Sequence, residues 1–341
     1  MRFSTFSLAP AVFAAICSAP VQAAESAQPF YAGKQITIAV GEPPGGSADA
    51  YARLLQRHLA RHIPGNPAII VQNMPGMGTL KPVTFLSTSA PVDGTVLATF
   101  SSTLLVEALT ARDRVNVDFR RFNWIGNTSE DVRICYVWAA SGVGNWQALK
   151  TPRVRSLFWG ATAPGTAGNA DAAILQHLFD AGIRPVQGYT GAADKRLAVE
   201  RREIDGDCAG WTSVPPDWLR DRKINVLLRL SRTLLPGMDP RVPFGGDLVR
   251  DERERNLYDF LVAPERLGRI YMTSEKVPAD RVAVLRAAFD ATTADLAFRT
   301  DAERLRLLVT PMSGGEVALE IADLYATPPD IIAQAKKILG E

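Results

Sequence analysis

The chain has 341 residues, of which 22% are charged and 47% are hydrophobic, and its formal net charge is +2. This length exceeds what one hydrophobic core normally supports and therefore predicts two domains. The balanced composition excludes collagen-like and disordered chains, the small charge gives no bulk electrostatic reason to bind nucleic acid or a membrane surface, and three cysteines cannot form a disulfide-dense scaffold.

Residues 1–23 have the pattern of a secretory signal peptide. Arg2 supplies the cation, an apolar run covers Phe6–Cys17, and small residues precede a cleavage point after Ala23. A membrane anchor is the alternative, but the apolar run is interrupted by Pro10 and is shorter than the roughly 20 residues of a spanning helix. We therefore expect an exported mature chain.

The next hundred residues alternate between strand and helix patterns. Short β-branched runs are separated by Pro/Gly loops and by segments with helical spacing of apolar residues. We expect strands at 36–41, 68–71 and 95–100, helices at 48–63 and 79–88, and loops at 42–47 and 75–78. The order β-α-β-α-β with short loops predicts a doubly wound α/β sheet.

The rest of the chain repeats this plan. The expected strands are 134–138, 156–159, 185–188, 204–209, 224–230 and 269–273. The expected helices are 166–180, 194–200, 278–296, 303–308 and 329–339, and the Pro/Gly-rich segment 234–251 is expected to be irregular. Two α/β halves of similar plan predict two lobes that face a cleft.

The residue types that usually carry catalysis or bind metals are sparse. His58 and His62 are four residues apart, a spacing that suits a metal, but no third ligand stands near them, and they are interpreted as a solvated basic face. His177 is interpreted as structural or exposed, and no Gly-x-Ser-x-Gly nucleophile motif is present. The sequence therefore predicts no catalytic residue, no metal and no cofactor.

One loop is placed to bind an anion. Residues 41–47 lie between the first strand and the first helix, where backbone N–H groups and the helix dipole favour negative charge. Gly45 and Gly46 leave the backbone bare, Ser47 can cap the helix, and Asp49 lies in its first turn. The loop has neither a dinucleotide nor a Walker A pattern. It favours a small carboxylate or polar ligand, and a purely structural tight turn is the alternative.

Together with several later motifs, this loop resembles the Bug proteins, the extracytoplasmic solute receptors of tripartite tricarboxylate transporters. The matching segments are Phe30–Asp49, Val71–Gly78, Pro91–Gly94, Gly165-Thr166, Tyr189–Gly191 and Glu203–Asp205. The resemblance extends from about residue 30 to the C-terminus and is looser after about residue 230. Each motif alone is weak, but their combination is specific.

The resemblance implies a type II-like periplasmic binding protein of two α/β lobes, each a doubly wound sheet flanked by helices. Lobe 1 would comprise residues 24–124 and 223–341, and lobe 2 residues 125–222. The protein would be a non-enzymatic monomer that closes on a small organic acid and serves transporter subunits or a sensor kinase in the membrane. A periplasmic transferase-like enzyme on the same fold is the alternative.

Carried over residue by residue, the resemblance also implies ligand contacts from both lobes. The expected ligand-binding residues are Pro43, Pro44, Gly45, Gly46, Ser47, Asp49, Ser101, Ser102, Pro164, Gly165, Thr166, Tyr189 and Trp211. For Tyr189 and Trp211, filling of the lobe core is the alternative. Asn169 and Thr190 stand where relatives favour His and Lys, which favours a less charged or aromatic acid over citrate.

The two-lobe plan that the resemblance implies also predicts where the two cysteines of the mature chain lie. Cys135 and Cys208 would lie on strands that run side by side, and we expect them to form a disulfide. Two separate buried thiols are the alternative.

Overall fold

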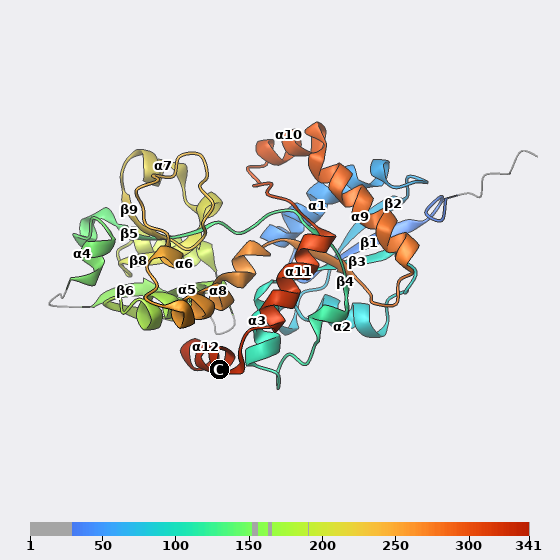
Figure 1. The fold of residues 1–341 in the computed structure, drawn as a ribbon. Helices are drawn as coiled ribbons and strands as arrows, with labels where there is room; N and C mark the ends of the chain where they lie inside the picture. The colour runs from blue at the N-terminus through green and yellow to red at the C-terminus, as the bar shows by residue number, and fades with distance from the viewer. Residues whose placement is uncertain (1–28, 152–155, 163–165, 190, 341) are drawn as a thin grey trace, which may run out of the picture.

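The computed structural model describes residues 29–151, 156–162, 166–189 and 191–340, and it contains two β-sheets in separate lobes (Figure 1). Within these ranges, no helix has the length and hydropathy needed to cross a bilayer. The predicted signal peptide, residues 1–23, lies outside the described residues.

The first lobe is built on a six-stranded sheet with the order β11-β4-β10-β3-β1-β2. Its strands are β1 (Gln35–Val40), β2 (Ala68–Asn73), β3 (Val96–Thr99), β4 (Asn123–Asn127), β10 (Ile270–Thr273) and β11 (Met312–Ser313). β1, β2 and β3 are parallel, whereas β10 is antiparallel to both β3 and β4. The carboxyl ends of β1, β2 and β3 therefore meet at one edge of the sheet.

Six helices surround this sheet. They are α1 (Ser47–Leu59), α2 (Lys81–Thr88), α3 (Thr103–Thr110), α9 (Ala279–Ala294), α10 (Leu296–Arg304) and α11 (Gly314–Tyr325). The apolar stripe of α1 packs with α9 on one face of the sheet, where Phe289 lies in the core. Gly126 of β4 accommodates that ring, because an added Cβ would lie 2.2 Å from Phe289 Cε1.

Two helix predictions near the C-terminus were wrong in their bounds. The expected helix 278–296 is interrupted at Asp295, whose carboxylate accepts the Ala297 N–H at 2.8 Å and so caps a new helix, α10. α10 ends at Arg304, so most of the expected helix 303–308 is not helical.

The second lobe is built on a five-stranded sheet with the order β7-β6-β8-β5-β9. Its strands are β5 (Arg133–Trp138), β6 (Leu157–Gly160), β7 (Ile183–Val186), β8 (Gly206–Gly210) and β9 (Ile224–Arg229). The helices are α4 (Trp146–Lys150), α5 (Ala167–Ala173), α6 (Ala192–Glu200) and α7 (Pro216–Arg220). β6 is parallel to β7 and β8, whereas β5 is antiparallel to β8 and β9. The carboxyl ends of β6, β7, β8 and β9 therefore share one edge.

The two cysteines of the described chain form a disulfide. Cys135 of β5 and Cys208 of β8 are direct partners in the antiparallel ladder, with their Cα atoms 4.0 Å apart. Both residues are about 1% exposed. The bond joins two central strands of the second sheet, so it stabilises the interior of that lobe.

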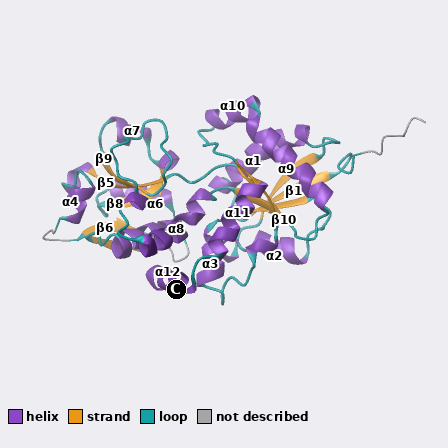
Figure 2. Ribbon diagram, viewed as in Figure 1, coloured by secondary structure: helices purple, strands orange, loops and turns teal. Residues whose placement is uncertain are grey.

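The lobes are linked by residues 128–132, by residues 267–269 and by two helices, α8 (Glu252–Arg266) and α12 (Pro329–Leu339). Figure 2 shows α3, α8 and α12 between the two groups of strands, and α12 contacts α3, α5 and α8. One hydrophobic cluster runs without interruption from Leu104 in the first lobe through Leu261 of α8 to Leu175 in the second. The two-lobe α/β architecture that the sequence predicted is confirmed.

The sheets correct the predicted lobe boundaries. β4 extends to Asn127 within the first sheet, so the chain crosses from lobe 1 to lobe 2 later than residue 125, the predicted start of lobe 2. β9 pairs with β5 in the second sheet, so residues 224–229 belong to lobe 2 although the sequence assigned them to lobe 1. An apolar strand fits either sheet equally well, and only its pairing partner decides.

Candidate functional site

The loops that follow β1, β2 and β3 are hydrogen-bonded to one another at the carboxyl edge of the first sheet. The Asn73 side-chain amide donates to the Glu42 carbonyl at 3.0 Å and to the Asp49 carboxylate at 2.9 Å. The Ser101 N–H donates to Thr79 Oγ1 at 2.9 Å. Open α/β sheets bind ligands at this edge. These hydrogen bonds therefore fix the shape of the first-lobe half of the candidate site.

Asp49 holds the first loop from beneath. Asp49 is 3% exposed, and its carboxylate accepts hydrogen bonds from the Gly45 N–H and from Arg53 Nε, both at 2.9 Å. Burial acts to raise the pKa of Asp49, but the hydrogen bonds from Arg53, Gly45 and Asn73 outweigh it and keep that pKa below its ordinary value. Asp49 thus has the geometry of a residue that shapes the loop, whereas the sequence predicted a ligand contact.

The outer side of the same loop is open. Pro43, Pro44, Gly45 and Ser47 are exposed, and Gly46 is half-buried. Gly45 has a φ of +82°, and a Cβ added there would meet no atom within 4 Å. Bare backbone therefore faces open space at this point, as close approach of a ligand requires.

The N-terminus of α1 already has one carboxylate. Glu42 Oε2 accepts the Ala48 N–H at 3.0 Å, and a Cβ at Gly46 would lie 2.6 Å from that oxygen. This carboxylate stabilises the start of the helix by charge and by hydrogen bonding. A ligand carboxylate at the loop would share the positive end of α1 with Glu42.

A cation from a distant part of the chain lies beside this loop. Arg269, in the segment that returns to the first lobe, donates to the Ser47 hydroxyl from Nε at 3.1 Å and from Nη2 at 2.7 Å. Its guanidinium lies 5.4 Å from the ring centroid of Tyr51, and the Tyr51 hydroxyl donates to the Leu308 carbonyl at 2.8 Å. Arg269 is half-buried, so its charge is both positioned and accessible.

The residues after β3 reach toward the second lobe. Ser102 is buried and donates its hydroxyl to the Pro264 carbonyl of α8 at 2.6 Å, so it joins the lobes at this point. The Ser101 and Thr103 hydroxyls are hydrogen-bonded at 2.8 Å. Thr103 and Thr166 line one apolar cavity of about 30 Å³ together with Pro264. The edges of the two sheets therefore approach each other here.

The second-lobe half of the site follows β6. Thr166 is the N-cap residue of α5, and its hydroxyl is hydrogen-bonded to that of Thr162. Pro164 and Gly165, which the sequence also placed here, lie outside the described residues. Among the described residues, Thr162 follows β6 and Thr166 precedes α5.

A buried cation lies beneath this loop. Lys195 is 3% exposed and donates to Asp207 Oδ1 at 2.5 Å and to the Cys208 carbonyl at 3.1 Å. A Cβ added at Gly168 in the first turn of α5 would lie 3.0 Å from Lys195 Nζ and 2.9 Å from Thr162 Oγ1. Burial raises the pKa of Asp207 to about 6, against the lowering effect of Lys195.

The two aromatic residues expected in the site, Tyr189 and Trp211, follow the carboxyl ends of β7 and β8 in the second lobe. Tyr189 and Trp211 are both half-buried and pack against the hydrophobic cluster that α6, α7 and one face of the sheet form around Tyr136. Trp211 also lines a cavity beside β9. No described contact joins either ring to the loop at residues 43–47.

Buried charges surround the crossing between the lobes. Arg133, the first residue of β5, bonds Asp171 of α5 through Nε at 2.8 Å and also through Nη2. Arg133 lies 3.3 Å from Asp131 and 3.9 Å from Glu265, the penultimate residue of α8. Burial, followed by the charge of Asp171, keeps the pKa of Glu265 well above its ordinary value. This network joins the linking segment 128–132 and the end of α8 to the second lobe.

His58 of α1 and His62 of the 3-10 helix that follows it (Ala60–His62) have structural partners. His58 Nε2 lies 3.0 Å from Asp301 Oδ2 of α10, and His62 Nε2 lies 3.0 Å from Oδ2 of Asp295, the residue that caps α10. Across the described ranges, no group of three His, Cys, Asp or Glu residues could hold a metal ion.

Neither protein-family models nor curated proteins give a match to this sequence. Solved structures do. A TctC solute-binding protein from Polaromonas aligns with a TM-score of 0.67 and 18% identity, over 89% of this chain and 99% of that one. The periplasmic binding protein BugD aligns with a TM-score of 0.63 and 16% identity, over 90% and 98% of the two chains. MatC from Rhodopseudomonas palustris, solved with bound malate, aligns with a TM-score of 0.61 and 18% identity, over 88% and 99%. The chain has the fold of a two-lobe periplasmic binding protein.

The periplasmic binding protein fold explains why the three parallel strands of the first sheet and those of the second end near each other. The first two of the proteins just named are described as binding proteins, and MatC was solved with malate bound. Sequence reasoning missed Arg269 and Lys195, which bring positive charge to the two halves of the site. Neither lies in a motif, and each acquires its place only through tertiary contacts with Ser47 or Asp207.

Proposed function

We propose that the mature chain is an extracytoplasmic receptor for a small organic acid. The observation that carries this proposal is the exposed Pro-Pro-Gly-Gly-Ser loop at the N-terminus of α1, with the Arg269 guanidinium bonded to Ser47 beside it. Backbone N–H groups, a helix N-terminus and one guanidinium are the groups that bind a carboxylate without a cofactor.

Binding would couple the lobes by closure. The linking segments 128–132 and 267–269 provide a hinge, and the acid would lie between the loop at 43–47 and the Thr162–Thr166 loop of the second lobe. A ligand that contacts both loops in the closed state binds that state more tightly than the open state, and this difference in binding free energy favours closure. The closed monomer would then be recognised by membrane transporter subunits of the tripartite type, or by a sensor kinase, in the periplasm.

The charge near the loop favours an acid of low charge. Glu42 competes for the N-terminus of α1, and the Lys195 ammonium is already paired with Asp207, so Arg269 is the cation with the clearest access. The malate bound by MatC shows that this fold accepts a small dicarboxylate in that protein. For this chain, a mono- or dicarboxylate therefore fits better than citrate.

The test is calorimetric titration of the mature protein, residues 24–341, with malate, adipate, citrate and benzoate. One-to-one binding of at least one mono- or dicarboxylate is expected, and NMR of the recovered acid should show it unchanged. Chemical conversion of the acid would instead support the transferase-like alternative. Tight binding of citrate alone would contradict the proposed charge preference.

A further inference from the structure

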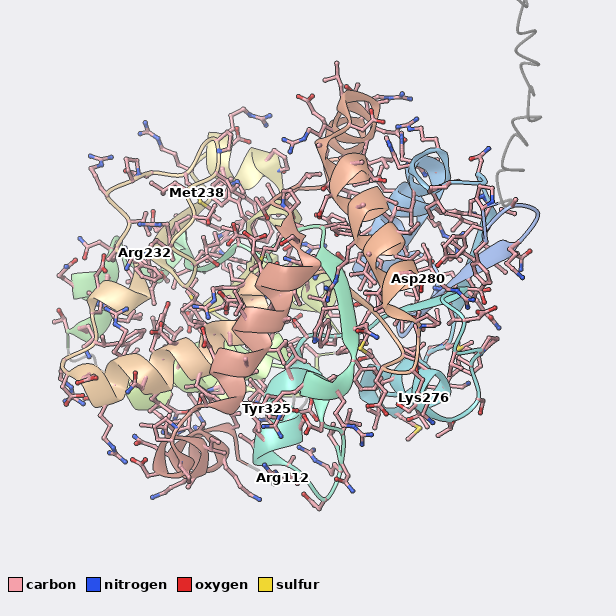
Figure 3. The ribbon with its side chains drawn as sticks, turned by 45° about the vertical axis from the view of Figure 1, so that its right-hand side comes forward. Arg112, Arg232, Met238, Lys276, Asp280 and Tyr325 are labelled. Atoms are coloured by element: carbon pink, nitrogen blue, oxygen red, sulfur yellow. A yellow bond between two sulfur atoms is a disulfide. The ribbon has the colours of Figure 1, made fainter. Side chains whose placement is uncertain are left out.

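A second cavity lies in the second lobe, and no described residue of the candidate-site loops lines it. Its volume is about 320 Å³, and apolar walls are supplied by β9 through Ile224 and Val226 and by the loop after β9 through Met238 and Val242. Figure 3 shows Met238 and Arg232 on this loop at the outer side of the lobe. Such a volume is at the lower end of small-molecule sites and suits one ring with a substituent.

A bulge in β9 turns a charged residue toward this cavity. Val226 pairs with Tyr136, but Leu228 pairs with Cys135, so one extra residue enters β9 between them. The alternation of the strand shifts there, and Arg229 lies on the same side as Val226. Without the extra residue, Arg229 would face the opposite side of the sheet, where Leu228 now packs.

Arg229 forms no ion pair with a described residue, and the negative charge of Asp247 acts on it only from beyond ion-pair distance. It is 8% exposed, and its guanidinium donates only to backbone carbonyls: Nε to Val242 at 3.1 Å and Nη1 to Arg232 at 3.1 Å and to Ser231 at 3.4 Å. Among the described residues, no carboxylate lies within 4.0 Å of it, and Nη2 has no hydrogen-bond acceptor. A buried cation normally has an anionic partner.

The opposite wall is aromatic. Trp211 lines the cavity, and Gly237 brings the covering loop close to the indole, since a Cβ there would lie 3.6 Å from Trp211 Cζ2. Asp239 lies at the same cavity and is paired with the exposed Arg241. An acid with a second negative charge would be repelled by Asp239, whereas a flat monoanion would meet the indole and the free Nη2 group.

We propose that this cavity is a second binding site, for a planar organic monoanion whose carboxylate pairs with Arg229 and whose ring packs against Trp211. Its described walls come from the second lobe alone, and none of residues 43–47, 101–102, 162 and 166 lines it. Occupancy of this site therefore requires neither lobe closure nor a ligand between the lobes.

The test uses 4-fluorobenzoate, followed by ¹⁹F NMR, and its neutral analogue 4-fluorobenzamide. Two variants address the site: Arg229→Met removes the charge, and Val226→Phe fills the cavity but keeps Arg229 and its bonds to the carbonyls. One variant is a control, Arg232→Met, which removes an exposed arginine of the same loop. A further variant, Arg269→Glu, reverses the charge at the first-lobe loop and reports on binding of the acid between the lobes.

We expect Arg229→Met and Val226→Phe each to weaken 4-fluorobenzoate binding at this cavity at least about tenfold, and Arg232→Met to change it less than about twofold. The benzamide should bind the wild type at least about tenfold more weakly than the acid. Loss of binding in Arg269→Glu, with Val226→Phe unaffected, would place the acid between the lobes and overturn the proposal. The proposal would also be overturned if the wild type bound no 4-fluorobenzoate up to ~10 mM, because a specific site binds far more tightly than that. This outcome would not bear on the proposed receptor function.

Discussion

The guanidinium of Arg269 donates two hydrogen bonds to the hydroxyl of Ser47, 222 residues earlier in the chain. Ser47 begins α1, and Arg269 ends the segment that returns from the second lobe, so the contact joins the hinge region to the candidate carboxylate loop. The arrangement places a cation at an exposed loop with bare backbone, and it suits recognition of a small acid.

Replacing Arg269 by Met should weaken acid binding about tenfold or more, because a charge-assisted hydrogen bond to the ligand carboxylate is lost. Arg269→Lys should retain part of the affinity. Calorimetric titration with the best acid of the panel measures both. The matched control is Arg266→Met, which removes an exposed arginine paired with Glu320. Equal affinities of the Met variants at 269 and 266 would show that Arg269 has no part in binding.

Replacing Glu42 by Gln should strengthen acid binding by about two- to fivefold at low ionic strength, because a like charge leaves the N-terminus of α1. The Gln side chain can still accept the Ala48 N–H, so the helix cap is kept. Titration at two salt concentrations measures the effect, and the exposed Glu275→Gln is the control for one lost charge. Weaker binding in Glu42→Gln would mean that the ligand carries a positive group toward Glu42.

The Cys135–Cys208 disulfide closes a segment with a sequence separation of 73 residues. Restriction of the unfolded chain by a loop of that size is worth about 4 kcal/mol in the chain-entropy description. Urea unfolding with and without a reductant should therefore show a lower midpoint after reduction. The double variant Cys135→Ala/Cys208→Ala should unfold near the reduced midpoint and be insensitive to reductant. A wild-type midpoint that reductant leaves unchanged, with the bond shown to be reduced, would refute this role.

Asp207 gives the fold a defined pH dependence. Its pKa rises to about 6 when it is buried beside Lys195, so between about pH 4 and pH 6 the folded state binds more protons here than the unfolded state does. The contribution of this group to stability is full below pH 4 and is lost as the pH rises through 6. The carboxyl of Glu265 acts in the same direction, because burial also raises its pKa.

The free energy of unfolding, measured against pH from 4 to 7, should fall less steeply in Asp207→Asn than in the wild type. The difference accumulated over this range should be about 3 kcal/mol, an order-of-magnitude figure for a shift of this size. Asp194→Asn, at an exposed aspartate one residue before Lys195, serves as the control. Parallel pH profiles for the wild type and Asp207→Asn would contradict a raised pKa at Asp207.

The sequence predicted the two α/β lobes because strand and helix patterns are local and alternate clearly. It left α8 without a prediction, and that helix contains Pro264, a residue that normally ends a helix. It also missed β4, whose Asn and Gly content is unusual for a strand, since Gly126 is required by the ring of Phe289 and by nothing in the local sequence.

The residues of the candidate site likewise include some that the sequence could predict and some that it could not. The glycine loop could be predicted, because its strand-loop-helix context and bare backbone can be read from consecutive residues. Arg269, Lys195 and the bulge that turns Arg229 could not, because each depends on pairing between segments distant in sequence. Trp211 was expected either to contact the ligand from the second lobe or to fill the lobe core, and it lines the cavity of β9.

The most direct test of the receptor proposal is an NMR titration of the mature protein with the acid panel, read at the backbone amides. We predict that one acid shifts the amide signals of Gly45, Gly46 and Ser47 most strongly, together with that of Thr166 across the lobes, in a saturable one-to-one manner. If every acid leaves these four amides unchanged while the protein is folded, the proposal that this loop binds a carboxylate is wrong.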